Sequence, residues 1–392
     1  MKALRNYLDK IKPHFEEGGK LHAFHSLFDG FETFIFVPNS TSTSGTHIHD
    51  MADSKRLMSF VVIALIPALL FGMYNVGYQH FIHAVGETGS FWEMFGYGFL
   101  AVLPKIIVSY VVGLGIEFAI AQWKKEEVNE GFLVSGILIP MIVPVDCPLW
   151  MLAVATAFSV IFAKEIFGGT GMNVFNVALV TRAFLFFAYP TKMSGDAVWV
   201  SSDSIFGLGQ TVDGLTVATP LGIASTAAAD QLPAFDINMV TGLIPGSIAE
   251  TSVIAILIGA AILLITGVAS WKVMFSVFVG GAFMGVIFNQ FGPDTAMAHM
   301  PWYQHLALGG FCFGAVFMAT DPVTSARTET GKYIFGFLIG VMAIVIRVLN
   351  PGYPEGMMLA ILLMNIFAPL IDYYVVQSNI NRREKRAINS NN

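Results

Sequence analysis

The pattern of apolar and polar positions is dominated by long runs that contain no Asp, Glu, Lys or Arg. Four of these runs match or exceed the roughly 20 residues that a helix needs to cross a bilayer, namely 57–86, 251–271, 273–293 and 295–320. The apolar runs and the polar breaks between them predict ten membrane-spanning helices, several of them short or interrupted. Their expected ranges are 57–76, 103–122, 131–145, 148–163, 173–189, 251–268, 272–290, 304–320, 333–349 and 356–376.

The composition supports the same fold class. Of the 392 residues, 55% are hydrophobic and only 12% are charged. Soluble domains carry roughly 25% charged residues. We therefore predict an all-α polytopic membrane protein with broken helices, flanked by the polar segment 1–56 and the basic C-terminal tail 377–392.

The first segment has its own apolar pattern. Five apolar side chains recur there at helical spacing, which predicts a short amphipathic helix that lies either on the membrane surface or against a partner. These side chains are Leu4, Tyr7, Leu8, Ile11 and Phe15.

The charges predict an orientation. With the N-terminus in the cytoplasm, 17 of the 21 Lys and Arg residues fall on the cytoplasmic side, as the positive-inside rule requires. The interval 190–250 carries six acids and a single lysine, Lys192, and is therefore expected outside the membrane on the opposite face. In the inner membrane of a Gram-negative bacterium that face is the periplasmic one, and both termini would be cytoplasmic.

The two halves of the chain show weak internal similarity. A shift of 185 residues aligns Ala183 with Ala368 and Tyr189 with Tyr374, together with the apolar runs that precede them. Since each half holds five spans, an odd number, the halves would face opposite ways across the membrane, as in transporter-like inverted repeats. Chance similarity between two apolar helices is the alternative. The expected units are the five-helix repeats 57–189 and 251–376 and the external loop 190–250.

Ionisable residues inside apolar runs are functional candidates, because a charge at the bilayer centre is costly. Glu117 follows Gly113 and Gly115 in VVGLGIEFAIA, where the glycines leave a groove in which a flat ring could approach the backbone. Arg182 lies well inside the fifth span and requires a carboxylate or an acceptor-rich ligand, so it counts as a candidate cofactor-binding residue. An ion pair that only holds helices together is the other interpretation of Arg182.

Two further acids occur at the edges of apolar runs. Asp321 opens DPVTSARTE, and Asp372 interrupts APLIDYYVV near the inner end of the last span. A helix cap before Pro322 is the structural alternative for Asp321. For Asp372 the alternative is a side chain that reaches out to the membrane interface.

The segment FGGTGMNVFNVAL, residues 167–179, combines glycines with two amides. Its GGTG lacks the Lys-Ser/Thr of a phosphate-binding loop, so a nucleoside triphosphate is not expected. We expect the glycines to break a helix, and we expect Asn173 and Asn176 to lie on one face of the helix that starts there. Such an amide face suits a ring with an imide N–H and carbonyls, such as a flavin. Hydrogen bonding between helices is the alternative.

Several classes of site are excluded. Cys147 and Cys312 have no CxxC spacing, so this chain alone builds neither a zinc site nor a four-thiolate cluster. His47 and His49 lie in a polar tail, where a metal site is not expected. The formal charge of −6 and the lack of a basic stripe argue against nucleic acid. No strand-GxGxxG-helix pattern occurs, so NADH must bind elsewhere.

The polar stretch DGLTVATPLG, residues 213–222, carries two hydroxyls three residues apart, Thr216 and Thr219. Neither threonine is in an Asn-x-Ser/Thr frame, which excludes a glycan. Either one could cap a helix that begins at Pro220. The stretch also looks like the Asp-Gly-x-Ser-Gly-Ala-Thr segment on which membrane redox pumps carry flavin mononucleotide (FMN) through its phosphate.

The resemblance extends over the whole chain, through VNEGFLVSGIL, AKEIFGGTGMNVFNVALVTRAFLFFAYP, MATDPVTSA and ILLMNIFAPLIDYYV. The chain resembles the B-type subunits of the Na+-translocating NADH:quinone reductases, within the Nqr/Rnf family of membrane flavoproteins. Two positions depart from the family pattern. Val217 stands where glycine is common and stiffens the turn, and Val177 stands where the family commonly has proline.

The resemblance implies cofactor roles. It assigns covalent FMN to the hydroxyl of Thr219, with Asp213 and Thr216 in the same binding motif. It assigns noncovalent riboflavin to Asn173 and Asn176. Electrons would then pass from an outer flavin to an inner one.

The resemblance also implies an end point for the electrons and a route for the ions. Gly113 and Glu117 match the quinone region, with ubiquinone as the expected substrate. Glu117, Asp321 and Asp372 match acids implicated in sodium uptake. The expected partners are an NADH-oxidising flavin and iron–sulfur subunit, a second covalent-FMN subunit and small membrane subunits. A pure channel or secondary transporter is the competing hypothesis, which the repeat alone would favour.

Overall fold

The computed structural model describes residues 2–16, 19–21, 24–36, 42–46, 54–124, 131–228, 232 and 234–390, and within these residues it is helical without a β-strand. Six helices in this part of the chain are long and apolar enough to cross a membrane. The prediction of an all-α polytopic membrane protein is thereby confirmed. The six spans contain α3 (Ser54–His80), α4 (Phe91–Lys124), α6 (Leu149–Ser159), α11 (Trp271–Phe291), α15 (Glu329–Leu349) and α16 (Met357–Ser390).

The other four predicted spans are short or broken helices. Three are α5 (Phe132–Met141), α7 (Val177–Ala188) and α10 (Val253–Ile265). The fourth, 304–320, is divided into α13 (Trp302–Ala307), α14 (Phe311–Phe313) and a π-helical turn η7 (Gly314–Met318). Gly309 and Gly310 make this break with φ of 64° and 68°, a left-handed conformation that glycine adopts without strain.

Several predicted boundaries were wrong. The helix at α3 continues through a π-helical turn to Val85, and α4 begins at Phe91 instead of 103. The prediction assumed one bilayer thickness for each span, but a helix satisfies its own backbone hydrogen bonds and need not end at the membrane surface. For the same reason α16 runs on to Ser390, so the described part of the basic tail is helical.

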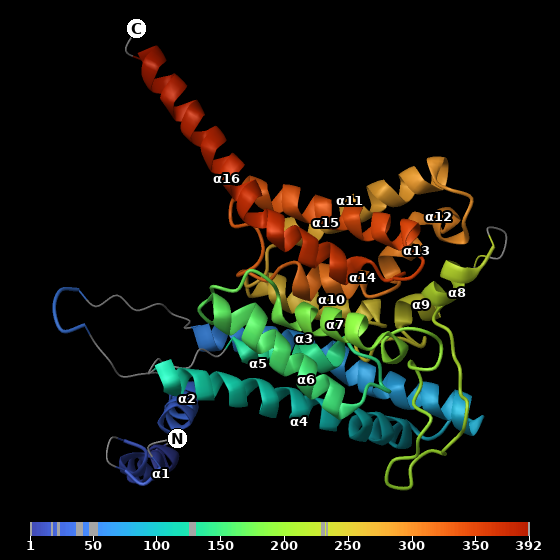
Figure 1. Ribbon diagram of the computed structural model, residues 1–392, viewed down its shortest axis with the longest axis horizontal. Helices are drawn as coiled ribbons and strands as arrows, with labels where there is room; N and C mark the ends of the chain where they lie inside the picture. The colour runs from blue at the N-terminus through green and yellow to red at the C-terminus, as the bar shows by residue number, and fades with distance from the viewer. Residues whose placement is uncertain are drawn as a thin grey trace.

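The two halves lie against each other in layers, with α3 to α7 in the lower half of Figure 1 and α10 to α16 in the upper half. Corresponding helices meet across this boundary, since α3 packs on α10 and α7 packs on α16. Small residues permit close crossings within each half. At Gly98 on α4, a Cβ atom would lie 1.7 Å from the carbonyl oxygen of Met73 on α3.

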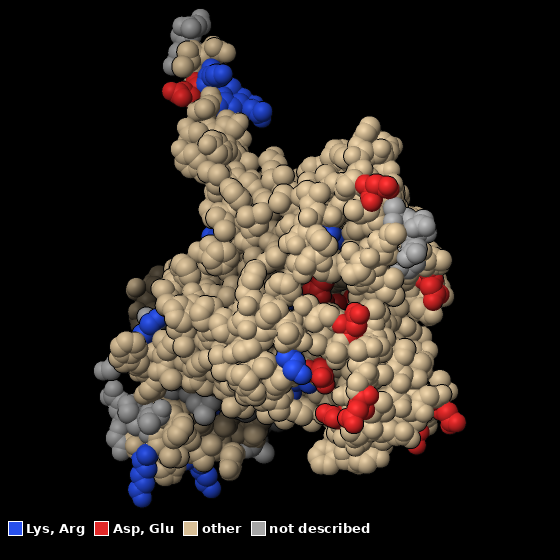
Figure 2. All heavy atoms as spheres, turned by 45° about the vertical axis from the view of Figure 1, so that its right-hand side comes forward, with Lys and Arg blue, Asp and Glu red and all other residues tan. Residues whose placement is uncertain are grey.

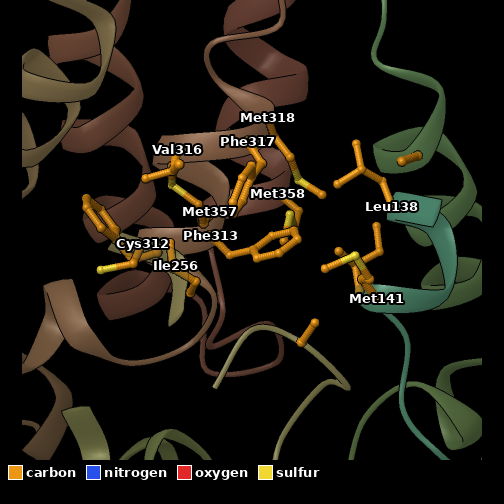
Figure 3. Close-up of a cluster of buried hydrophobic side chains, with 14 of the residues drawn as sticks. Leu138, Met141, Ile256, Cys312, Phe313, Val316, Phe317, Met318, Met357 and Met358 are labelled. Carbon is orange, nitrogen blue, oxygen red and sulfur yellow. The ribbon is translucent and has the colours of Figure 1, made fainter. Parts of the chain in front are cut away.

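The centre of the molecule is an apolar cluster built from broken helices of both halves. Figure 3 shows Leu138 and Met141 of α5 on one side and Phe313, Met318 and Met358 on the other. All five side chains are buried. Helix α5 ends at Met141, and η7 follows the break at Gly309 and Gly310, so the chain next to both lies close to the boundary between the halves.

The N-terminal amphipathic segment folds onto the chain itself. It forms α1 (Lys2–Ile11), and Arg5 and Lys12 both pair with the carboxylate of Glu32 on α2 (His25–Ile35). Leu8 is buried, whereas Tyr7 is exposed. Of the five apolar side chains expected on one face of this helix, Leu8 is therefore covered by the chain itself, whereas Tyr7 faces outward.

His80, the last residue of α3, holds the segment between α7 and α8 (Pro220–Thr226) against α3 and α4. Its Nδ1 lies 2.7 Å from the carbonyl oxygen of Ser201, and its Nε2 accepts from the backbone N–H of Gln210 at 3.1 Å. Because a carbonyl can only accept, Nδ1 carries the proton and the ring is neutral. The ring also stacks on Tyr97, whose hydroxyl donates to Asp203.

We expect His80→Ala to loosen this segment, because two hydrogen bonds and a stacked ring are lost together. We expect local stability to fall by about 1–3 kcal/mol, the usual cost of leaving one buried polar group unpaired. Limited proteolysis or hydrogen exchange of residues 199–212 measures it. His83→Ala is the matched control, because His83 is exposed one turn further along. Equal protection in His80→Ala and the unaltered protein would contradict the expectation.

Candidate functional site

One cavity, the Thr219 cavity, has a volume of about 440 Å³. It lies where α7 and the start of α8 meet three turns of the chain. These turns are at 244–251, 307–310 and 351–355. Figure 2 shows acidic atoms inside a recess of the face that it views. Its polar lining includes Arg182, Ser194, Asp196, Thr219, Ser247, Glu250, Tyr353 and Glu355.

Thr219 is positioned by the start of a helix. It is the N-cap of α8, and its Oγ1 accepts from the backbone N–H of Gly222 at 2.9 Å. Pro220 occupies the first helical position, which suits its fixed φ. The capping prediction for Thr219 is confirmed. Because capping uses a lone pair of the oxygen, it leaves the hydroxyl proton available for substitution.

The other two residues of the stretch lie elsewhere. Thr216 and Asp213 are exposed and do not line the Thr219 cavity. Val217 donates its backbone N–H to the carbonyl oxygen of Asp196 at 2.7 Å, which holds the extended approach to Thr219 in place. The structure therefore brings only the last hydroxyl of the motif to the cavity.

Arg182 lies in the wall of the cavity and has the carboxylate partners that its burial requires. Its side chain is 2% exposed and forms ion pairs with Glu355 and, at 3.5 Å, with Glu250. It also donates to Ser247 Oγ at 3.2 Å. Two carboxylates thus share one guanidinium, and the trio carries an excess negative charge when both acids are ionised.

Glu250 is the less satisfied of the two acids. Its Oε1 is buried and has no hydrogen-bond partner among the described residues. Burial raises the pKa of Glu250, although attraction by Arg182 opposes this shift. A buried carboxyl oxygen without a donor is a point where a ligand N–H or a proton would be stabilised.

Sequence reasoning did not single out Glu250 or Glu355. A signal was present, because each follows a Pro-Gly turn and directly precedes a predicted span, at 245–246 and 351–352. Only the folded chain brings these two turns to the same guanidinium.

The second cavity, the Asn176 cavity, has a volume of about 300 Å³ and is lined by both apolar and polar side chains. Asn173, Asn176 and Asp321, predicted from separate motifs, all line it. Lys164 and Thr170 line it too, and Thr170 Oγ1 is buried without a hydrogen-bond partner among the described residues. Its apolar lining includes Leu57, Met58, Val61, Leu138, Leu263 and Phe317.

The two asparagines differ in role, which corrects the prediction of one helical face. Asn176 is the N-cap of α7, and its Oδ1 accepts from the backbone N–H groups of Ala178 and Leu179. Asn173 precedes the helix and donates to the carbonyl oxygen of Phe175 at 3.0 Å. The helix begins at Val177 because asparagine caps a helix better than it continues one.

Asp321 closes the cavity from the second half. It accepts from Asn176 Nδ2 at 3.1 Å, from the Val323 N–H at 3.0 Å and from Thr324 Oγ1 at 3.2 Å. Burial raises the pKa of Asp321, while these hydrogen bonds oppose the shift. Asp321 orders the turn after η7 instead of capping a helix, and it joins the two halves through Asn176.

Glu117 forms a buried ion pair with Lys164, with the two side chains 4% and 5% exposed. Lys164 also lines the Asn176 cavity, whereas Glu117 does not. Asp372 lies apart from both cavities. It accepts from the N–H of Arg327 at 2.7 Å and from the N–H and hydroxyl of Thr328, and so ties α16 to the start of α15.

The groove expected at Gly113 holds a flat ring of the protein itself. A Cβ atom at Gly113 would lie 1.9 Å from Cζ of Phe132, whereas a Cβ atom at Gly115 would meet open space. We expect Gly113→Ala to destabilise the α4–α5 contact by about 1–3 kcal/mol, the usual effect of overpacking. Thermal unfolding in detergent measures it.

Gly115→Ala is the matched control, and the double variant Gly113→Ala/Phe132→Leu should recover part of the loss because the ring is removed. A Gly113→Ala protein as stable as the control would show that Phe132 moves aside without strain.

A comparison with protein families decides what the chain is. The model of the NQR2, RnfD, RnfE family matches residues 41–381. The chain belongs to this family. The B-type subunit of the Na(+)-translocating NADH-quinone reductase of Chromohalobacter salexigens is 46% identical over 98% of this chain and 96% of its own length. The corresponding subunits of Pseudomonas aeruginosa and Azotobacter vinelandii are 44% and 42% identical, with coverage of 98% of this chain and 99% and 100% of theirs.

Val177, where the resemblance led us to expect proline, lies at a helix start. Val177 is the first residue of α7, a position that proline suits. Among the described residues no three His, Cys, Asp or Glu side chains form a group that could hold a metal ion. His47 and His49 lie outside the described residues. Cys147 and Cys312 are buried free thiols.

Proposed function

We propose that this chain is the electron-transferring membrane subunit of a sodium-pumping NADH:quinone reductase. Three relatives named as subunits of such a reductase match it over nearly their whole length. The observation that carries the flavin part of the proposal is the position of Thr219, whose hydroxyl lies on a cavity large enough for a ring system. Electrons would enter from an NADH-oxidising partner subunit.

The Thr219 cavity fits a flavin tethered at its rim. FMN joined through its phosphate to Thr219 Oγ1 would direct its ring into the cavity, where Arg182 and Glu250 offer a donor and an unpaired acceptor. A ring with carbonyls and an imide N–H matches that pair of groups. The flavin supplies the electron chemistry, and the protein sets its position and surroundings.

The Asn176 cavity fits a second, noncovalent flavin. A mostly apolar pocket with a few convergent polar groups is the usual form of a cofactor site. Asn173, Thr170 and Lys164 would face its polar rim, and the unpaired hydroxyl of Thr170 would gain a partner. Riboflavin has the imide and the hydroxyls that such an edge recognises. Transfer from the Thr219 cavity to the Asn176 cavity would carry electrons from one side of the fold towards the other.

We further propose that quinone, ubiquinone in the simplest case, is reduced near Gly113 and Glu117, outside the groove that the Phe132 ring fills. We also propose that Glu117, Asp321 and Asp372 serve sodium uptake. On the face shown in Figure 2, acids gather on the side that carries α8, while basic side chains lie mainly elsewhere and on the projecting end of α16. This supports an inner-membrane orientation with Thr219 in the periplasm and both termini in the cytoplasm.

Mass spectrometry of the fragment that spans 213–222 tests the proposal directly. The complex is purified from its native membranes and the fragment is expected to carry FMN. A flavin-fluorescent band that survives denaturing electrophoresis is the second expected result. An unmodified fragment and a colourless band would favour the channel or secondary transporter, for which broken helices meeting at the boundary of two halves are also suited.

A further inference from the structure

Arg347 is a second buried guanidinium beside the Thr219 cavity. It lies in the last turn of α15, and its side chain is fully buried. Arg182 pairs with two carboxylates, whereas the hydrogen bonds of Arg347 in the described part of the chain go to carbonyl oxygens alone. Burying a cation among neutral acceptors is costly, so this position requires an explanation of its own.

The carbonyl oxygens belong to two turns that meet at the cavity. Nη1 donates to His305 at 2.6 Å, and Nη2 donates to Leu308 at 3.1 Å and to Gly309 at 3.4 Å. These carbonyls lie at the C-terminal end of α13, where the helix itself offers them no N–H partner. Nη2 also donates to the carbonyl oxygen of Glu355 at 3.0 Å. One guanidinium thereby ties the turn at 307–310 to the turn at 351–355, and both turns line the Thr219 cavity.

The two turns determine where the acids that share Arg182 lie. Glu355 belongs to the second turn itself. Glu250 packs against the first turn, because a Cβ atom at Gly310 would lie 3.0 Å from the carboxyl carbon of Glu250. Arg347 therefore acts on both carboxylates through the backbone, although its own hydrogen bonds go to carbonyl oxygens.

Arg347 also completes the balance of charge around the cavity. Arg182, Glu250 and Glu355 together carry one negative charge when both acids are ionised, and Arg347 brings one positive charge to the same turns. Charges buried in a medium of low dielectric constant interact more strongly than charges in water. Loss of Arg347 would therefore make the surroundings of the cavity negative and disfavour further negative charge inside it.

We propose that Arg347 is a positioning residue of the Thr219 cavity, which holds Glu250 and Glu355 in place through the two turns and stabilises a reduced ring by its charge. The inference rests on the proposed function, since it requires a flavin at Thr219. That ring gains one electron from the partner subunit, which is thereby oxidised, and loses it again to the ring proposed for the Asn176 cavity.

The test uses the complete complex. It measures the midpoint potential of the covalent flavin by redox titration and the hydrogen exchange of the backbone at 305–310 and 355–357. In Arg347→Met, the ratio of reduced to oxidised flavin at a fixed potential should fall about tenfold, a shift of about 59 mV to more negative values for one electron. Exchange should rise at both turns, because the guanidinium that ties them together is lost.

Arg347→Lys separates the charge from the positioning. Lysine keeps the positive charge, but it lacks the planar fork of donors that reaches both turns at once. Exchange should therefore rise at the turns, while the potential stays near that of the unaltered complex. Arg347→Gln covers the case in which Arg347→Met fails to assemble, since it is neutral and keeps two amide donors for the carbonyls. Its potential should shift as in Arg347→Met.

Lys332→Met is the matched control. Lys332 is a basic residue of the same helix, but it pairs with Glu329 at the opposite end and lines neither cavity. Its loss should change neither the potential nor the exchange at the two turns.

The possible failures are distinguishable. An unaltered complex without covalent flavin would overturn the proposed function and this inference with it. A covalent flavin that keeps its potential in the neutral variants, or that shifts equally in Arg347→Lys or in Lys332→Met, would overturn the inference alone. So would unchanged exchange at both turns in Arg347→Lys, a result that decides the matter even if neither neutral variant assembles.

Discussion

Replacement of Thr219 by asparagine is expected to abolish the proposed covalent flavin and, with it, the proposed electron transfer through the subunit. Asparagine is a good helix N-cap, so the bond to the Gly222 N–H is retained while the hydroxyl that would carry the phosphoester is lost. The variant should therefore fold and assemble as the unaltered protein does. Flavin fluorescence on a denaturing gel should fall to background, and NADH-driven quinone reduction should fall with it.

Three further variants separate attachment from capping. Thr219→Ser keeps both the cap and a hydroxyl and should retain flavin. Thr219→Val loses both the cap and the hydroxyl. It should therefore lose the flavin and also about 1 kcal/mol of stability, the usual effect of a missing cap. Thr216→Val is the matched control, because its side chain is exposed and away from the cavity. Full fluorescence in Thr219→Asn would show that the flavin is carried elsewhere.

The second large effect is expected for Arg182→Met. The substitution leaves Glu250 and Glu355 beside each other without the cation between them, and breaking a buried ion pair on one side costs about 3–5 kcal/mol. That is a large fraction of the stability of most proteins. We expect little folded protein, and a lower midpoint of thermal unfolding in detergent for what remains.

The triple variant Arg182→Met/Glu250→Gln/Glu355→Gln should recover most of this stability, because no uncompensated charge is left in the cavity. Arg327→Met is the control for loss of a basic side chain, since Arg327 is exposed. If the single and triple variants were equally unstable, packing of the Arg182 side chain, and not its charge, would be the cause.

The fold class was predictable because it depends on local composition. The length of an apolar run and the polar breaks around it are readable one segment at a time, and all ten predicted spans contain helix. Their ends were less predictable. Asn176 ends up as a cap and Asn173 outside the helix, because capping depends on which N–H groups need an acceptor. The periodicity of the side chains does not show that.

The site was partly predictable for a related reason. Thr219, Asn176, Asp321 and Arg182 were found because a polar group in an apolar context needs an explanation of its own. Lys164 was passed over as one of many basic residues near a predicted membrane edge. Its importance depends on Glu117, 47 residues away along the chain.

The sequence by itself determined that this is an all-helical membrane protein. It also determined where along the chain the charges lie and which polar residues lie in apolar surroundings. Only the tertiary structure decided that these residues form two cavities, that one guanidinium serves two carboxylates, and that Phe132 fills the groove at Gly113. The reason is physical. Hydrophobic transfer acts on each segment separately, whereas ion pairs and close packing exist only between groups that the fold brings together.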